Sequence, residues 1–112
     1  SALRLDEAVR DPMALHMAGS PISCLANVHC AAATENFMVM ENHAVDIPWW
    51  NDVVAGIEKP LVDKGFIKVP EGPGLGFTSV NEDVIRQHLA EPGYFEPTDD
   101  WNKERSNDML WS

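Results

Sequence analysis

Two short apolar runs, in residues 12–16 and 36–41, dominate the hydrophobic pattern of the first half of the chain. Each run is too short for a stable helix, and short runs bounded by polar or turn-forming residues predict β-strands. Each predicted strand ends in a side chain that can move a proton, His16 in the first and Glu41 in the second. The pattern therefore predicts two strands that carry candidate chemistry at their C-terminal ends.

The residues between the two strands predict a helix over 21–34. Ser20 is a favourable N-cap residue, and Pro21 suits the first helical position. One helical face is expected to be buried, at spacings of three and four residues: Ile22, Leu25, Ala26, His29, Ala32 and Ala33. A strand–helix–strand crossover lays its strands parallel, so His16 and Glu41 are expected to open onto one face. In α/β folds ligands bind at that carboxyl-end face.

The rest of the chain predicts smaller elements. In order, these are a short helical piece over 47–54 that opens at Pro48, a hairpin of 61–63 and 66–69 around Lys64-Gly65, a loop over 70–76, and a helix over 81–89 capped by Asn81. Residues 1–11 predict a short amphipathic segment, and the residues after Glu91 an irregular tail. Trp49 and Trp50 are interpreted as anchors against neighbouring elements, with contact to substrate or to a symmetry mate as the alternative.

Composition and charge exclude several classes of partner. The 112 residues make one domain at most, and the net charge of −10 comes from 18 acidic and 8 basic residues without a basic cluster. This balance argues against binding to nucleic acid or to an anionic membrane surface. The sequence has no apolar run of about 18 residues and no signal-peptide pattern, so a soluble, cytoplasmic protein is expected.

Cys24 and Cys30 are expected to be free thiols. They lie six residues apart, which is about 600° of helical rotation, so their sulfur atoms would lie on different faces. Together with His29 they could suggest a metal site, but zinc ligands usually come as closely spaced pairs with a fourth ligand nearby. We interpret these three residues as packing positions, since free cysteine behaves as a small hydrophobe.

Several segments, read together, resemble a known family. In chain order they are Ala14-Leu-His-Met-Ala-Gly-Ser-Pro-Ile-Ser23, Ala26-Asn-Val-His-Cys-Ala-Ala-Ala33, Glu35-Asn-Phe37, Met40-Glu-Asn-His43, Asp46-Ile-Pro-Trp-Trp50, Val69-Pro70, Pro73-Gly-Leu-Gly76, Asn81-Glu82 and Leu110-Trp-Ser112. These segments resemble the end of an enolase-superfamily barrel, and are most similar to the sugar-acid dehydratases of the mandelate racemase subgroup, of the galactonate or gluconate dehydratase type. The resemblance spans about residues 12–112.

The resemblance implies an α/β fold, namely the C-terminal portion of a (β/α)7β TIM barrel and an extension that packs on an N-terminal capping domain. A complete barrel takes about 250 residues, so this chain would hold only its last quarter or so. Residues 1–56 would be the end of the barrel and residues 57–112 the extension. The expected partners are the remainder of the barrel, the capping domain and further copies in a homo-oligomer, because strands that are apolar on both faces need to be covered.

The resemblance also implies a site. The family's histidine after the seventh strand removes the proton α to the substrate carboxylate, and His16 matches it. Glu41 matches a glutamate at the end of the eighth strand that shares a hydrogen bond with the substrate carboxylate, for which it must be partly protonated, as burial would favour. Gly19 and Pro21 would bind substrate. The implied cofactor is Mg²⁺, with carboxylate ligands on the third to fifth strands and none in this sequence.

Other interpretations stay open. From the residues alone, His16 is more often a structural, hydrogen-bonded histidine, and Glu41 can be a carboxylate that caps the next loop. The family's sixth-strand aspartate, which usually orients the histidine, is not identifiable here. The implied function is part of a Mg-dependent acid-sugar dehydratase that eliminates water through an enediolate. The alternatives are a racemase or epimerase of the same superfamily, which needs a second base, and a non-catalytic fragment that acts only in association.

Overall fold

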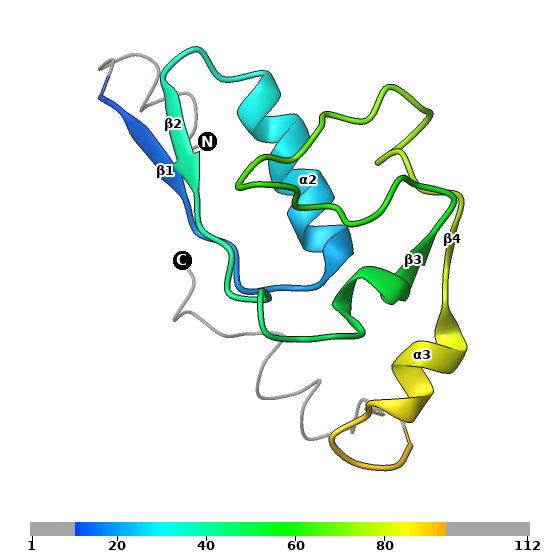
Figure 1. The fold of residues 1–112 in the computed structure, drawn as a ribbon. Helices are drawn as coiled ribbons and strands as arrows, with labels where there is room; N and C mark the ends of the chain where they lie inside the picture. The colour runs from blue at the N-terminus through cyan, green and yellow to red at the C-terminus, as the bar shows by residue number, and fades with distance from the viewer. Residues whose placement is uncertain (1–10, 94–112) are drawn as a thin grey trace, which may run out of the picture.

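The structure is a computed structural model that describes residues 11–93, with its elements arranged as in Figure 1. The elements are β1 (Met13–Leu15), α2 (Pro21–Ala32), β2 (Phe37–Met40), the 3-10 helix η1 (Trp50–Val53), β3 (Val54–Ala55), β4 (Ser79–Val80) and α3 (Glu82–Gln87). The amphipathic segment predicted over residues 1–11 and the tail predicted after Glu91 fall almost entirely outside the described residues. Among the helices of residues 11–93, none has the length and apolar character needed to span a membrane.

β1 and β2 are neighbouring parallel strands joined by α2, which confirms the predicted strand–helix–strand unit (Figure 1). Leu15 lies opposite Met40 in the register, with an irregularity directly after Met13. The Glu41 amide donates a hydrogen bond to the Leu15 carbonyl at 2.9 Å, so the pairing continues to the end of both strands. The two carboxyl ends therefore lie side by side, and this brings His16 next to Glu41.

α2 begins at Pro21, as predicted, and ends two residues before the predicted end. Ser20 occupies the N-cap position without a capping bond from its side chain, and the Cys24 amide donates to the Ser20 carbonyl at 3.0 Å. The buried residues of α2 are Pro21, Cys24, Leu25 and Val28. Of the six positions predicted to be buried, only Leu25 is among them. The buried face differs from the predicted one because α2 packs on core residues that come later in the chain, namely Ala44, Trp50, Val54 and Leu61. The periodicity of the helix cannot reveal where these residues lie.

The core lies between α2 and the segments on either side of it along the chain. Its buried members are Met17, Cys24, Leu25, Val28, Ala44, Trp50, Val54 and Leu61. Leu25 and Val54 have no exposed surface, and burying an aliphatic side chain of this size stabilises a fold by about 1.5–3 kcal/mol. The core includes Met17 from the loop after β1 and Ala44 from the loop after β2. These two loops therefore pack together with α2.

The two tryptophans anchor loops. Trp50 is 5% exposed, and its Nε1–H donates to the Gly19 carbonyl at 3.1 Å. Trp49 is half-buried and stacks on the imidazole of His88, with ring centroids 4.1 Å apart. The anchoring interpretation is therefore confirmed for Trp50, which ties the loop after β1 to η1.

The predicted hairpin around Lys64-Gly65 is present as a tight turn only. Asp63 and Phe66 form a single antiparallel bridge with two reciprocal hydrogen bonds of 2.9 Å. Both turn residues have positive φ, 51° at Lys64 and 81° at Gly65, which is the requirement of a two-residue type I′ turn. The loop over 70–76 is irregular, as predicted. The turn itself was predicted correctly, whereas the residues on either side of it do not form the predicted strands.

β3 and β4 form a short antiparallel pair that the sequence did not predict, because two residues are too few to show an alternation. The Asn81 amide donates to the Val53 carbonyl at 2.8 Å, and the Asn81 side chain accepts from the Val84 amide at 3.3 Å, which caps α3 as predicted. α3 ends at Gln87, earlier than expected, and the helical piece predicted over 47–54 is reduced to η1. The predicted division of the chain at residue 56 stays a prediction.

β2 presents apolar side chains to solvent. Phe37 is 38% exposed, Met38 63% and Val39 49%. On one side, residues of β2, of α2 and of the turn after Lys64 line an apolar groove of about 380 Å³. Within the described residues the sheet of β1 and β2 has only these two strands. Exposed apolar patches of this kind mark surfaces that associate.

The isolated 112-residue chain is therefore expected to self-associate at micromolar concentration. Sedimentation velocity measures this directly. The variant Met38→Glu, which places a charge on the most exposed apolar side chain of β2, should shift the distribution towards smaller species. A compact monomer that unfolds cooperatively would contradict the expectation and would also weaken the assignment of the chain to part of a barrel.

Candidate active site

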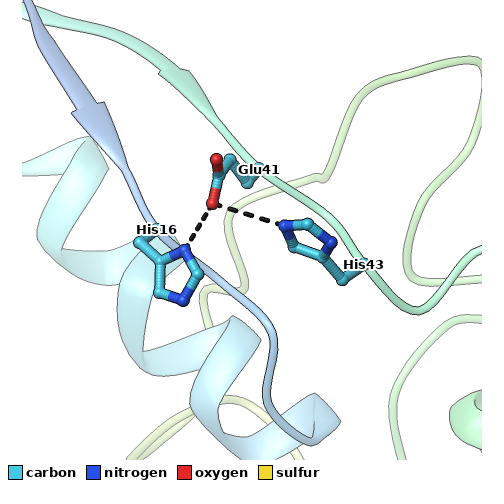
Figure 2. A group of neighbouring side chains, drawn as sticks. All are labelled: His16, Glu41 and His43. Atoms are coloured by element: carbon cyan, nitrogen blue, oxygen red, sulfur yellow. Dashed lines mark hydrogen bonds and ion pairs between the residues drawn. The ribbon is translucent and has the colours of Figure 1, made fainter.

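Three polar side chains meet at the carboxyl ends of β1 and β2 (Figure 2). His16 directly follows β1, Glu41 directly follows β2, and His43 lies two residues further along the chain. His16 Nδ1 lies 2.5 Å from Glu41 Oε2, and His43 Nε2 lies 3.5 Å from the same oxygen. The centroids of the two imidazole rings are 5.9 Å apart. The structure thus brings the two predicted catalytic residues together and adds a second histidine to them.

Hydrogen bonds to the backbone position these three residues, which we call the His–Glu–His cluster. The Asn27 side chain, on α2, donates to the His16 carbonyl at 3.4 Å and so links the end of β1 to the helix. The Asn42 side chain accepts from the Ala44 amide at 2.9 Å, which forms a turn of the kind that asparagine favours. Because Ala44 is part of the core, this turn fixes the backbone on both sides of His43.

All members of the His–Glu–His cluster are open to solvent, with 78% of the His16 side chain, 51% of Glu41 and 59% of His43 exposed. The pKa of Glu41 is lowered, chiefly by the hydrogen bond from His16, and desolvation opposes this shift. Glu41 is therefore ionised at neutral pH. The expectation that burial would keep it partly protonated is not met in this structure, because the Glu41 carboxylate is half exposed and lies beside two imidazole rings.

Gly19 and Pro21, the predicted substrate-binding residues, have packing roles in the structure. The Gly19 carbonyl accepts the hydrogen bond from Trp50, and a Cβ atom added at Gly19 would lie 2.8 Å from Ser23 Cβ. Pro21 is fully buried at the first position of α2. Both residues shape the turn that leads from His16 into the helix, and their contact with substrate stays a prediction.

His43 is the site residue that the sequence analysis did not single out. A signal for it exists, because residues two apart in an extended chain project to the same side, so a side chain at position 43 can follow the one at position 41. The chain leaves the regular strand at Met40, however, and beyond that point the alternation carries no information. Only the turn at Asn42 places the second imidazole beside the carboxylate.

Cys24, His29 and Cys30 do not form a second site. Both cysteines are free, as predicted, with Cys24 buried in the core and Cys30 exposed. Burial raises the pKa of Cys24 to about 11, which keeps it a thiol instead of a reactive thiolate. His29 Nε2 lies 3.4 Å from the Leu75 carbonyl and links α2 to the loop over 70–76. The packing interpretation therefore holds for Cys24.

The donor atoms of the His–Glu–His cluster do not suit Mg²⁺, the cofactor that the family resemblance implies. Mg²⁺ takes oxygen ligands in near-octahedral geometry, whereas this cluster offers two ring nitrogens and one carboxylate. It is also the one group of three potential metal ligands found within residues 11–93. A magnesium site built from the described residues is therefore not supported.

A parallel strand–helix–strand unit with a histidine and a carboxylate at the ends of its strands is typical of α/β folds, in which ligands bind at the carboxyl ends of the strands. Residues 2–84 match the family described as enolase C-terminal domain-like, and the chain belongs to this family. The domain of this family is a TIM-barrel-type α/β fold, and its members are enzymes. The resemblance seen in the sequence is thus confirmed.

Two relatives make the relationship more specific. The chain is 38% identical over 80 residues to a D-xylonate dehydratase of Haloferax volcanii, a match that covers 71% of this chain and 19% of that protein. It is also similar to the crystal structure of a mandelate racemase/muconate lactonizing enzyme-like protein from Rubrobacter xylanophilus, with a TM-score of 0.73 and 37% identity, over 80% of this chain and 22% of that one. The chain therefore spans about a fifth of the length of these relatives.

Proposed function

We propose that this chain is the part of an acid-sugar dehydratase that supplies the catalytic base. In this reaction the proton α to the carboxylate of a sugar acid is removed, and water leaves through an enediolate. The observation that carries the proposal is the 2.5 Å contact between His16 Nδ1 and Glu41 Oε2 at the carboxyl ends of two parallel strands. Family membership and the similarity to a D-xylonate dehydratase support the class of reaction.

The contact with Glu41 determines which nitrogen of His16 can act as the base. Because ionised Glu41 can only accept, the hydrogen lies on Nδ1, and Nε2 keeps a free lone pair. Nε2 takes the α proton, and the electron pair of the C–H bond stays on the substrate as the enediolate. The electron pair then expels the β-hydroxyl, which takes up the proton from the His16 imidazolium and leaves as water. The Glu41 carboxylate stabilises the imidazolium through a charge-assisted hydrogen bond.

Glu41 has a different role in this proposal from the one that the resemblance implied. An ionised, exposed Glu41 orients His16 and stabilises its charged form, whereas a protonated Glu41 would donate to the substrate carboxylate. It thereby supplies the carboxylate partner that the family usually takes from its sixth strand. His43 lies on the far side of the same oxygen, where it can hold Glu41 in place, and we assign it as a positioning residue.

The complete enzyme would also need groups from outside this chain. The proposal includes Mg²⁺, which when bound would make the α proton more acidic by binding the substrate carboxylate. Its ligands are proposed to lie on other strands of the barrel, because the described donor atoms do not suit it. The remainder of the barrel, the capping domain, a homo-oligomeric assembly and a cytoplasmic location are parts of the same proposal.

The test is an assay of the encoded polypeptide that contains these residues, with Mg²⁺, against five- and six-carbon sugar acids including D-xylonate. Formation of a 2-keto-3-deoxy acid is expected from at least one of them. Proton NMR in D₂O follows the α hydrogen at the same time. Deuterium at the α carbon with inverted configuration and no loss of water would support the racemase or epimerase alternative. Neither exchange nor dehydration with any acid would favour the non-catalytic alternative.

A further inference from the structure

The His–Glu–His cluster has a property that proton abstraction does not require. One potential ligand atom from each of His16, Glu41 and His43 lies within 4.8 Å of the other two. Figure 2 shows both imidazole rings directed at the same carboxylate oxygen, from two different segments of the chain. A dyad of base and carboxylate needs only one of these rings. The second ring turns the dyad into a three-ligand arrangement.

The types of donor atom favour a divalent transition-metal ion. Imidazole nitrogen combined with carboxylate oxygen is a common ligand set for zinc and its neighbours in the first transition row. In a tetrahedral zinc site, bonds of about 2.0–2.1 Å place ligand atoms about 3.3–3.4 Å apart. His43 Nε2 and Glu41 Oε2 are already 3.5 Å apart. The shorter His16–Glu41 contact would open by less than about 1 Å, as the ion replaces the shared hydrogen.

The cluster is also accessible and held in place. Each of the three side chains is more than half exposed, so an ion can enter and keep water as its remaining ligand. His16 and Glu41 are fixed by the pairing of β1 with β2, and His43 is held by the turn at Asn42. Exposed side chains on a fixed backbone can make the small adjustment that coordination needs.

We propose that His16, Glu41 and His43 form a binding site for a divalent transition-metal ion of the zinc type, and that occupation of this site stops His16 from acting as a base. The second part rests on the proposed function. A neutral imidazole that binds an ion through Nδ1 carries its hydrogen on Nε2, so the lone pair needed for the α proton is absent. A zinc-type ion at this site would therefore lower the rate of the proposed dehydration, whereas Mg²⁺ at its own site would raise it.

The binding part is tested on the encoded polypeptide that contains these residues, by titration with Zn²⁺, followed by calorimetry, and with Co²⁺, whose visible absorption reports tetrahedral coordination. One saturable site per chain is expected. His43→Ala should weaken binding by more than about tenfold, because even partners one step removed from a metal contribute about 10–100-fold to affinity. Mg²⁺, whose ligands are proposed to lie on other strands, should bind equally well to the unchanged protein and to His43→Ala. No saturable Zn²⁺ site, or no loss of Zn²⁺ affinity in His43→Ala, would overturn the proposal.

Two further variants test whether a loss of Zn²⁺ affinity is specific to the imidazole of His43. His88→Ala removes an exposed imidazole outside the cluster and should leave the Zn²⁺ affinity unchanged. His43→Gln keeps a polar side chain of similar size but has no imidazole, so it should lose binding as His43→Ala does. Equal losses in His88→Ala and His43→Ala would overturn the proposal. These readouts involve no substrate, so they remain decisive even if no sugar acid is dehydrated.

Discussion

Replacing His16 by asparagine is expected to lower kcat for sugar-acid dehydration by about 10²–10⁴-fold, the usual contribution of a positioned general base. Asparagine can still donate a hydrogen bond to Glu41, but it has no lone pair of imidazole basicity to accept the α proton. KM should change much less, because the proposed role of His16 is proton transfer and not the binding of substrate. Steady-state kinetics on the encoded polypeptide with its best sugar acid measure both constants.

His88→Asn is the matched control for this experiment. His88 is exposed and stacks on Trp49, outside the His–Glu–His cluster, so the same chemical change there should leave kcat within about twofold. Exchange of the α hydrogen in D₂O should disappear together with dehydration in His16→Asn. Retention of exchange at the wild-type rate would mean that another group removes the proton, and His16 would lose its assigned role.

Shortening Leu25 to alanine is expected to cost about 2–5 kcal/mol in the free energy of unfolding. Leu25 has no exposed surface and lies at the centre of the core between α2 and the segments that carry the strand ends. The cavity left behind cannot collapse easily, because folded interiors are close-packed and the neighbouring core residues Cys24, Val28 and Trp50 are themselves buried. Urea denaturation of the encoded polypeptide, with hydrogen exchange of the α2 amides, measures the loss.

Leu89→Ala is the control, because it makes the same change at a leucine that is 44% exposed. A smaller loss, below about 1 kcal/mol, is expected there. Equal losses at both positions would show that the side chain of Leu25 is not buried as the structure has it. The packing of α2 against the other core residues would then need to be revised.

The parallel unit of β1, α2 and β2 was predictable because its determinants are local. Short apolar runs, a proline at the first helical position and a histidine or a glutamate at each strand end are visible in the sequence without knowledge of any partner. The turn at Lys64-Gly65 and the cap at Asn81 were predictable for the same reason. The buried face of α2 was not, since it depends on which segment the helix meets.

The candidate site also has features that the sequence could predict and features that it could not. His16 and Glu41 could be selected from their places at the ends of the strands, and the parallel register then brought them together. The ionised state of Glu41 could not be inferred, because it depends on exposure and on the hydrogen bond from His16. The place of His43 was equally hidden, because it depends on a turn outside regular structure.

The sequence by itself determined the strand–helix–strand unit, the family and the two residues at its strand ends, because periodicity, capping and motif are properties of neighbouring residues. The tertiary structure alone decided that α2 buries Leu25 with Cys24 and Val28, that Glu41 is a solvated carboxylate, and that a second imidazole lies beside it. These features depend on segments that approach one another only after folding. The burial of a side chain, its ionisation state and its contacts depend on these distant segments, so a local sequence pattern does not encode them.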